Sequence, residues 1–179
     1  MPGQRCDPTP EQVPAAVRVH KISGDLAQMD NVDALVNPWN RNYMPRWLLF
    51  PGGVSRALKR RTGPGPWKQL ARAGVLPVGG CVITDAGHLS EHTKLIHVAG
   101  LNLVWRATEA TVDASVHTVI RAAVAHQMHR IAMPLIGSGS GGLDRASSLH
   151  CIQKALGNYT HGHPIDVLVV EHDDAFDHL

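Results

Sequence analysis

Cysteine is scarce in this sequence of 179 residues, and the few cysteines present do not fit a disulfide or zinc-binding role. Cys6, Cys81 and Cys151 are odd in number and far apart. They match neither a disulfide framework nor the paired spacing of a zinc site. Histidines are more numerous, but the cluster at 161–163 also fits no structural zinc pattern. We therefore expect no bound metal and a reducing compartment, most simply the cytoplasm.

Long apolar runs and a strong excess of charge are also missing. No stretch approaches the roughly 18 consecutive apolar residues of a membrane span. The formal net charge of +2 is too small to indicate nucleic acid as the main partner, and we interpret the basic run 56–61 as a solvated helix face. The length suits one domain with a real core. We expect a loose, proline-rich leader at 1–16, a single domain at 17–172 and a tail at 173–179.

A glycine-rich turn between a strand and a helix is the most informative feature that is present. The apolar run Ile131 to Ile136 predicts a short buried strand, and Gly-Ser-Gly-Ser-Gly-Gly follows at 137–142, before a helical stretch near Arg145. Glycines let backbone N–H groups converge without obstruction from Cβ atoms, and the positive end of the next helix adds to that field. The turn therefore suits a phosphate or a pyrophosphate; the alternative is a flexible surface loop.

The position of this turn argues against two common phosphate-binding motifs. Gly137, Gly139 and Gly142 satisfy GxGxxG. The dinucleotide fingerprint, however, follows the first strand of a βαβ unit and needs an acidic residue about 20 positions later. This turn lies late in the chain, and no Gly-Lys-Ser/Thr of a Walker motif follows it. Another class of phosphate loop is needed.

Predicted strands and helices alternate along the chain. Apolar runs predict strands, and helical spacing of apolar residues predicts helices. The strands are expected at 17–22, 34–36, 80–84, 94–98, 131–136 and 165–170, and the helices at 54–61, 67–73, 111–129 and 146–156. The alternation predicts an α/β domain with a mostly parallel, buried sheet. Ligands of such sheets bind beyond the carboxyl ends of the strands. Four segments should meet there: 24–25, 37–40, 51–55 and 137–142.

The order and spacing of these segments resemble the macrodomain family of ADP-ribose-binding modules. The resemblance is carried by ISGDLAQMDNVDALVNPWN (22–40), GGVSRALKRRTG (52–63), GGCVITDAGHL with LIHVAG (79–100) and IAMPLIGSGSGGLD (131–144). It covers nearly the whole chain after residue 17. It implies a three-layer α/β/α sandwich with a mixed, mostly parallel sheet, and it implies ADP-ribose as the ligand.

The resemblance also implies a set of ligand-binding residues. They are Gly24, Asp25, Leu26, Asn40, Gly52, Gly53, Val54, Ser55, Gly137, Ser138, Gly139, Ser140, Gly141 and Gly142. Asp25 would accept a hydrogen bond from the adenine amino group, since a carboxylate only accepts; alternatively it caps the helix that follows. Asn40 would face the distal ribose, whereas the side chain of Asn37 would hold the loop by hydrogen bonds to backbone groups. The glycines would surround the diphosphate, with Ser138 and Ser140 either donating hydroxyl groups to it or only shaping the turn.

For two other side chains, packing in the hydrophobic core is a simpler interpretation than ligand binding. Trp39 either packs on the ribose or fills the core, and core packing is the simpler interpretation. His97, within a predicted strand, is expected to be a core residue with a satisfied ring rather than a metal ligand.

The sequence departs from the family at two binding positions. MacroD-type hydrolases carry an aspartate directly after Gly-Gly-Val, where this chain has Ser55, which is no base at neutral pH. Gly141 replaces the family's aromatic residue in the second phosphate loop. Aromatic residues in the long connection 43–50 either cover the distal ribose in its place or form an apolar surface patch.

One carboxylate remains well placed for catalysis. Gly142-Leu-Asp-Arg145 resembles the terminal ADP-ribose protein glycohydrolase branch, which uses that aspartate in catalysis. The lysine that this branch takes from an earlier strand is absent from 82–85. Asp144 is therefore either a catalytic residue or the N-cap of the next helix.

These inferences together predict a hydrolase that removes ADP-ribose from modified proteins. Ester-linked acidic side chains are the favoured acceptors, because such a leaving group departs without a strong general acid. Asp144 would position the attacking water and Asn40 would fix the ribose. The alternatives are a non-catalytic reader of ADP-ribose and an ADP-ribose 1''-phosphate phosphatase. We expect ADP-ribose and ADP-ribosylated proteins as partners, no cofactor, no membrane, no nucleic acid, and a cytoplasmic monomer.

Overall fold

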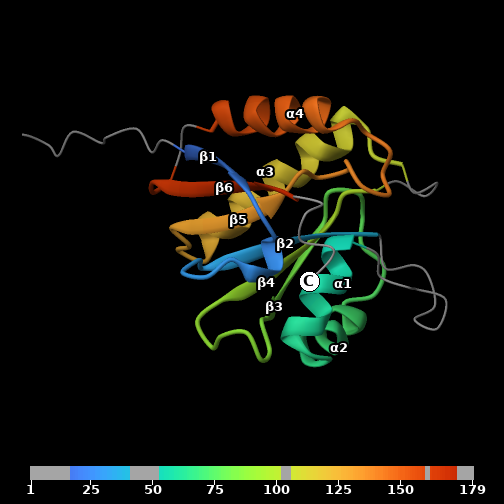
Figure 1. Ribbon diagram of the computed structural model, residues 1–179, viewed down its shortest axis with the longest axis vertical. Helices are drawn as coiled ribbons and strands as arrows, with labels where there is room; N and C mark the ends of the chain where they lie inside the picture. Colours follow the sequence, from blue (N-terminus) through green and yellow to red (C-terminus); the bar gives the residue numbers. More distant parts are fainter. Residues whose placement is uncertain (1–16, 41–52, 102–105, 160–161, 173–179) are drawn as a thin grey trace, which may run out of the picture.

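A computed structural model describes residues 17–40, 53–101, 106–159 and 162–172. The predicted elements are all present in it, and a short 3₁₀ helix lies where a turn was expected (Figure 1). In chain order they are β1 (Val17–Ser23), η1 (Leu26–Gln28), β2 (Ala34–Trp39), α1 (Gly53–Thr62), α2 (Gly65–Arg72), β3 (Cys81–Asp85), β4 (Lys94–Ala99), α3 (Glu109–Ala125), β5 (Arg130–Pro134), α4 (Arg145–Gly157) and β6 (Ile165–Glu171). The predicted leader, the tail and the connection 43–50 lie outside the described residues.

The strands form one six-stranded sheet in the order β1-β6-β5-β2-β4-β3. Four of the pairings are parallel, and only β3 runs antiparallel, against β4. The prediction of a mixed, mostly parallel sheet is therefore confirmed. Since five strands run in the same direction, their carboxyl ends share one edge of the sheet.

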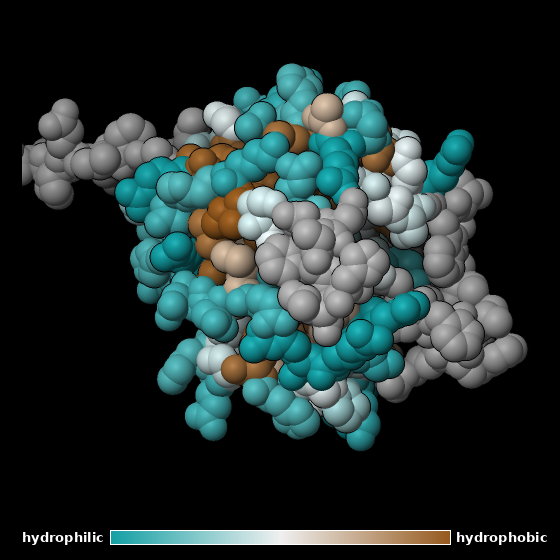
Figure 2. All heavy atoms as spheres, in the orientation of Figure 1, coloured by the Kyte–Doolittle hydropathy of each residue, from teal (hydrophilic) through white to brown (hydrophobic). Residues whose placement is uncertain are grey.

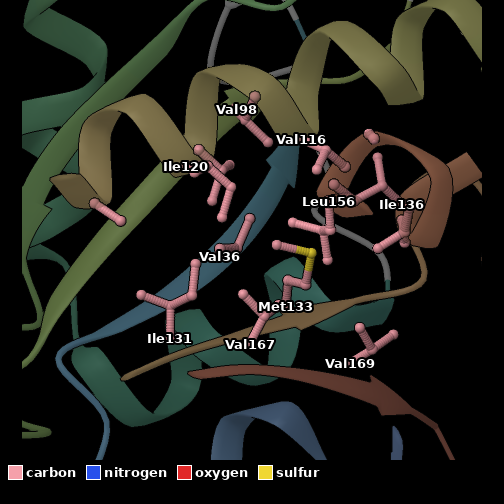
Figure 3. Packing of buried hydrophobic residues seen from close by; sticks show 14 of the residues in the cluster. Val36, Val98, Val116, Ile120, Ile131, Met133, Ile136, Leu156, Val167 and Val169 are labelled. Atoms are coloured by element: carbon pink, nitrogen blue, oxygen red, sulfur yellow. The ribbon is translucent and has the colours of Figure 1, made fainter. Parts of the chain in front are cut away.

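Helices cover both faces of this sheet, so the predicted three-layer sandwich is also confirmed (Figure 1). On one face, Met133 and Val167 pack with α3 and α4 residues such as Ile120 and Leu156 (Figure 3). On the other face, Leu35 and Leu168 pack against α1 and α2. Successive strand residues point to opposite faces, which explains why strands buried on both sides read as continuous apolar runs in the sequence.

Strand β2 is longer than the sequence suggested, and it contains a proline. Proline has no N–H for a ladder bond and is normally excluded from central strands. Here β2 pairs with β5 only at Ala34 and Leu35, whereas it pairs with β4 as far as Trp39. The carbonyl of Trp39 accepts from Gly100 on the β4 side. Pro38 therefore faces the β5 side, where the ladder has already ended, and its missing N–H loses no pairing.

Two other boundaries differ from the predictions. α3 begins earlier, where Thr108 caps it, and it ends at Ala125 rather than at 129. Gln127, with a φ of 54°, has left the helical conformation. β5 ends at Pro134 instead of 136, so the loop that follows it begins with two buried apolar residues, Leu135 and Ile136.

The surface of the described residues is largely polar. On the face shown in Figure 2, hydrophobic residues appear as small patches between polar side chains. Among the described residues, Val75 is the most exposed large hydrophobic residue, with 61% of its surface exposed. No helix in the described ranges is long and apolar enough to cross a membrane. The same residues contain no group of three or more His, Cys, Asp or Glu side chains placed to hold a metal ion.

Ion pairs on the outer strand β1 make stability depend on acid pH. Arg18 Nε donates to Asp166 Oδ1 at 2.7 Å, and this hydrogen bond lowers the pKa of Asp166. The contribution of a carboxylate with a lowered pKa is fully present above its unfolded pKa, near pH 4, and is lost as pH falls through its folded pKa. We expect the free energy of unfolding to fall between about pH 5 and pH 2.5, and to fall less in Asp166→Asn. Urea titrations at both pH values measure this.

Asp30→Asn is the matched control, since Asp30 is exposed and forms no ion pair with any described residue. It should leave the pH dependence of unfolding close to that of the wild type. If Asp166→Asn gave the same pH profile as Asp30→Asn, the ion pair would not contribute to stability.

Candidate functional site

The segments predicted to bind the ligand lie along one edge of the sheet, at the carboxyl ends of its parallel strands or at the start of α1. Gly24 follows β1, and its N–H donates to the carbonyl of Glu171 on β6 at 2.9 Å. Asn40 follows β2 and is buried. Residues 137–142 follow β5, and Gly53 to Ser55 form the first residues of α1. Gly52 lies outside the described residues. The predicted convergence at one edge of the sheet therefore holds for the other positions.

β2 and β5 are adjacent, but the helices that follow them lie on opposite faces of the sheet. β2 leads to α1 on one face of the sheet, and β5 leads to α4 on the other (Figure 1). Such a reversal is the switch point at which α/β sheets bind ligands. Because the β2–β5 ladder ends at Leu35, the carboxyl halves of the two strands are not joined by pairing. The loop after β5 and the start of α1 are placed on either side of this position.

The glycine loop, residues 137–142, is held in shape by hydrogen bonds within the loop, and some of its backbone N–H groups make no such bond. Gly142 N–H donates to the carbonyl of Gly139, and Leu143 N–H donates to that of Gly137. Ser138 uses its hydroxyl on the carbonyl of Leu135 at 2.9 Å, so its role is to shape the turn. The backbone N–H groups of residues 139–141 donate to no described residue. Three successive N–H groups at a glycine-rich turn are suited to bind an anion.

The glycines of this loop serve different purposes. Gly137 has a φ of 86°, and a Cβ atom there would lie 2.4 Å from the Cβ atom of Ala107. A Cβ atom on Gly141 would lie 2.8 Å from the same atom. The aromatic residue expected from the family is thus absent because Gly141 is buried against the segment before α3, where Ala107 N–H donates to its carbonyl. By contrast, a Cβ atom on Gly139 would meet nothing within 4 Å.

This difference predicts that two alanine substitutions in the loop destabilise the protein to different extents. Gly137→Ala should lower the free energy of unfolding by roughly 1–3 kcal/mol, because it combines a left-handed backbone with overpacking. Gly139→Ala should change it by less than about 0.5 kcal/mol. Urea unfolding of both variants measures the difference. Equal destabilisation would show that the packing on Ala107 does not set the loop.

The N-terminal end of α1 is a second region of partial positive charge. α1 begins at Gly53, has ten residues, and carries no acidic residue in its first turn. Its N-terminal end therefore presents the positive side of the helix dipole without a carboxylate to neutralise it. Val54 is half-buried and packs against the core on that face of the sheet.

Asp25 caps the helix that follows it. Its Oδ1 accepts from the N–H of Ala27 at 2.9 Å at the start of η1, and it is half-buried. The capping alternative is therefore realised in the structure. The binding role stays a prediction, since one carboxylate has a second oxygen with lone pairs to offer an adenine amino group. Leu26, next to it, is buried in the core.

Asp144 is likewise an N-cap. It is exposed, and its Oδ1 accepts from the N–H of Ser147 at 2.9 Å at the start of α4. Hydrogen bonding from Ser147 holds the pKa of Asp144 below its ordinary value. The carboxylate also neutralises the positive end of α4, so the loop N–H groups, rather than the helix, remain as the donors for an anion. Such a carboxylate is a weak base, and any catalytic role would consist of orienting a water.

A buried polar chain behind Ser55 is the feature that the sequence did not reveal. Ser55 Oγ donates to Asn37 Oδ1 at 2.7 Å, and Asn37 Nδ2 lies 2.9 Å from His97 Nδ1. His97 Nε2 lies 3.1 Å from Thr84 Oγ1. Asn37 and His97 are fully buried. Burial lowers the pKa of His97 to about 3, so its ring is neutral. The expectation of a core histidine with a satisfied ring is confirmed.

Asn37 thus binds side chains rather than the backbone of its loop. The expectation of side-chain bonds to the backbone is not what the structure shows, because β2 continues through Asn37 and directs its amide toward β4 and α1. A polar residue inside an apolar strand, together with a histidine in the next one, was the only signal in the sequence.

Trp39 fills the core, as the simpler interpretation predicted. It is 8% exposed and packs edge-to-face on Trp67, with ring centroids 5.3 Å apart. Trp67 in turn packs edge-to-face on His97 at 5.2 Å. The indole N–H of Trp39 has no hydrogen-bond partner among the residues that the structure describes.

A shallow hollow lies elsewhere, between the start of β3 and the middle of α3. Its lining includes Val78, His117 and Arg121, and it contains none of the predicted ligand-binding residues. None of its lining residues belongs to the loop 137–142, and it plays no part in the proposed site.

Comparison with known sequences finds a matching family model and several similar proteins. A family model described as Macro domain matches residues 36–152. The O-acetyl-ADP-ribose deacetylase of Escherichia fergusonii is 31% identical over 167 residues, covering 88% of this chain and 89% of the relative. The enzyme of the same name from Escherichia coli K12 is 30% identical over 172 residues, covering 90% and 92%.

Solved structures show the same fold. The Trypanosoma brucei macrodomain in complex with ADP-ribose superimposes with a TM-score of 0.74 at 17% identity, covering 90% of this chain and 66% of that one. The macrodomain of Mycobacterium tuberculosis DarG gives a TM-score of 0.69 at 23% identity, covering 87% and 98%. At these identities the likeness concerns the fold alone.

Proposed function

The chain belongs to the macrodomain family, and on this basis we propose that it is a hydrolase that binds an ADP-ribosyl group and cleaves an ester of it. The observation that carries the proposal is the set of three successive N–H donors at 139–141, which lie beyond the carboxyl end of β5, together with the start of α1, whose first turn has no acidic residue. A diphosphate fits between two such elements, because both supply partial positive charge without a bulky side chain.

An ester is the bond that the site residues suit best. The curated relatives are named for deacetylation of O-acetyl-ADP-ribose, which is the hydrolysis of an ester. An ester that joins ADP-ribose to a glutamate or aspartate side chain also releases a carboxylate, and this leaving group needs no strong general acid. We propose acidic side chains of proteins as the acceptors from which ADP-ribose is removed.

In the proposed reaction a water attacks the anomeric carbon of the distal ribose. The new bond joins the water oxygen to that carbon, the bond to the acceptor carboxylate breaks, and a proton is released to solvent. Asp144, ionised because its pKa is lowered, would orient the water. Asn40, buried at the end of β2, would hold the ribose. The proposed reaction uses water and requires no cofactor.

Non-catalytic recognition is the second candidate, and two observations favour it. Ser55 stands where hydrolases of the MacroD type carry an aspartate, and Asp144 already serves as a helix cap. A reader would bind ADP-ribose through the same loops and release nothing. Hydrolysis of ADP-ribose 1''-phosphate is a third outcome that the same assays detect.

The adenine end of the site can be tested by binding. The protein should bind ADP-ribose, and AMP more weakly, because AMP has no second phosphate for the 139–141 donors. Asp25→Ala should weaken ADP-ribose binding by roughly 1–3 kcal/mol, the scale of a hydrogen bond to a charged group. Titration calorimetry measures all three affinities.

Asp25→Asn separates binding from capping, because asparagine caps a helix as well as aspartate does. We expect Asp25→Asn to keep the melting temperature of the wild type and still to bind ADP-ribose less tightly. Unchanged affinity in both variants, with a lower melting temperature in Asp25→Ala alone, would leave Asp25 with the capping role only. An absence of any ADP-ribose binding by the wild type would overturn the proposed function.

The proposed role of Asp144 can be tested by measuring the rate of ADP-ribose release. Asp144→Asn should lower the rate of ADP-ribose release from ester-modified protein by about 100-fold or more if the carboxylate orients the water. The ADP-ribose affinity and the melting temperature should change little, since asparagine retains the cap. Release is followed by chromatography of free ADP-ribose. The control is Asp113→Asn, which changes a half-exposed carboxylate on α3.

Full activity in Asp144→Asn would remove Asp144 from the reaction. Tight ADP-ribose binding without release from any acceptor would favour the reader. Release of phosphate from ADP-ribose 1''-phosphate, without release from protein esters, would favour the phosphatase.

A further inference from the structure

The buried chain behind Ser55 links the start of α1 to strand β3 across the sheet. From Ser55 the hydrogen bonds pass through Asn37 on β2 and His97 on β4 to Thr84 on β3. The exposed fractions of these side chains range from 8% at Ser55 to 0% at Asn37 and His97. A polar chain this deeply buried must be internally satisfied, because each unpaired group would be strongly destabilising.

The far end of the chain determines the direction of every hydrogen bond in it. Thr84 Oγ1 donates to the carbonyl of Asp85 at 2.9 Å. A carbonyl can only accept, so the single hydroxyl proton of Thr84 is committed there. His97 Nε2 must then carry a proton and donate it to Thr84 Oγ1. Since a neutral imidazole has one proton, His97 Nδ1 is unprotonated and accepts from Asn37 Nδ2.

The same direction extends to the surface end at Ser55. With its amide nitrogen facing His97, Asn37 turns its oxygen toward Ser55 and accepts the hydroxyl proton at 2.7 Å. The single hydroxyl proton of Ser55 is therefore donated to Asn37, away from the ligand side. Its remaining lone pairs are the only hydrogen-bonding capacity that it can offer to a ligand, and they can only accept.

Ser55 is also placed where a ligand at the carboxyl edge would meet it. It is the third residue of α1, and its Oγ lies 3.4 Å from the carbonyl of Pro38, next to the end of β2. Asn40, which is expected to face the distal ribose, follows two residues after Pro38. A sugar hydroxyl is a hydrogen-bond donor, and an oxygen that only accepts is its complement.

We infer that Ser55 is a specificity residue that accepts a hydrogen bond from a hydroxyl group of the distal ribose, and that Asn37, His97 and Thr84 are positioning residues that hold its proton away from the ligand. This inference rests on the proposed function, since it takes ADP-ribose as the ligand. These four side chains are uncharged. They would therefore favour a ligand by the direction of its hydrogen bond and not by electrostatic attraction between charges.

Binding of two ligands tests the role of Ser55. ADP lacks the distal ribose and is the reference ligand. Ser55→Ala should lower the affinity for ADP-ribose by about 3- to 10-fold, the scale of one neutral hydrogen bond, and the affinity for ADP by less than about twofold. Calorimetry measures both. Ser115→Ala, which removes a buried serine hydroxyl on α3 outside the chain, should change neither.

Thr84→Val tests the positioning role without touching the site. It removes the acceptor for His97 Nε2, so the ring is expected to move its proton to Nδ1 and Asn37 to reverse its amide. Ser55 would then receive a hydrogen bond from Asn37 and turn its own proton outward. The affinity for ADP-ribose should fall as in Ser55→Ala, and the affinity for ADP should stay within about twofold of the wild type.

The tautomer of His97 gives a readout that needs no ligand. In the wild type at neutral pH, long-range ¹H–¹⁵N correlation spectra should show His97 with a protonated Nε2 and an unprotonated Nδ1, assigned by the signals lost in His97→Gln. A proton on Nδ1 would overturn the inference even if a variant failed to fold. Equal effects of Ser55→Ala on ADP-ribose and ADP would overturn it while leaving the proposed function intact. A wild type that binds neither ligand would overturn the proposed function, and the ligand role of Ser55 with it.

Discussion

The early end of the pairing between β2 and β5 is the constraint on which the site depends. The two strands are joined only at Ala34 and Leu35, although both continue toward the same edge of the sheet. This arrangement accommodates Pro38 in a central strand, because its missing N–H falls on the unpaired side. α1, which follows β2, packs on one face of the sheet, and α4, which follows β5, packs on the other. The start of α1 and the glycine loop are thereby placed around one position.

Most of the polar groups at that position are already engaged within the protein. Asp25 and Asp144 cap helices, and Ser138 closes its own turn. Gly137 and Gly141 lie so close to Ala107 that a side chain at either position would clash with it. What remains for an anion is the backbone of residues 139–141 and the start of α1. A diphosphate would thus be held mainly by main-chain dipoles, which are pre-organised and require little ordering of side chains on binding.

The replacement of an aspartate by Ser55 changes the electrostatics of the site more than its hydrogen bonding. A carboxylate at that place would add a negative charge near a diphosphate. A serine whose proton is held by Asn37 keeps the ability to accept without that charge. Its support by a neutral His97, buried against Trp67, avoids placing a charge in the core. The protein thus retains an acceptor at this position, while Asp144, the carboxylate proposed to act in catalysis, lies at the surface.

The local pattern of the sequence determined the elements, the mostly parallel sheet, and the loops that lie at its edge; that the sheet is mixed came from the family resemblance. Apolar runs and glycine positions are local properties, and they predicted the helices and strands to within a few residues. The family resemblance added the three layers and the expected ligand. Only the tertiary structure decided the rest. It showed that β2 extends through Pro38, that Gly141 is buried against Ala107, and that Asn37 pairs with a histidine 60 residues away. These features depend on contacts between distant segments, which no local pattern encodes.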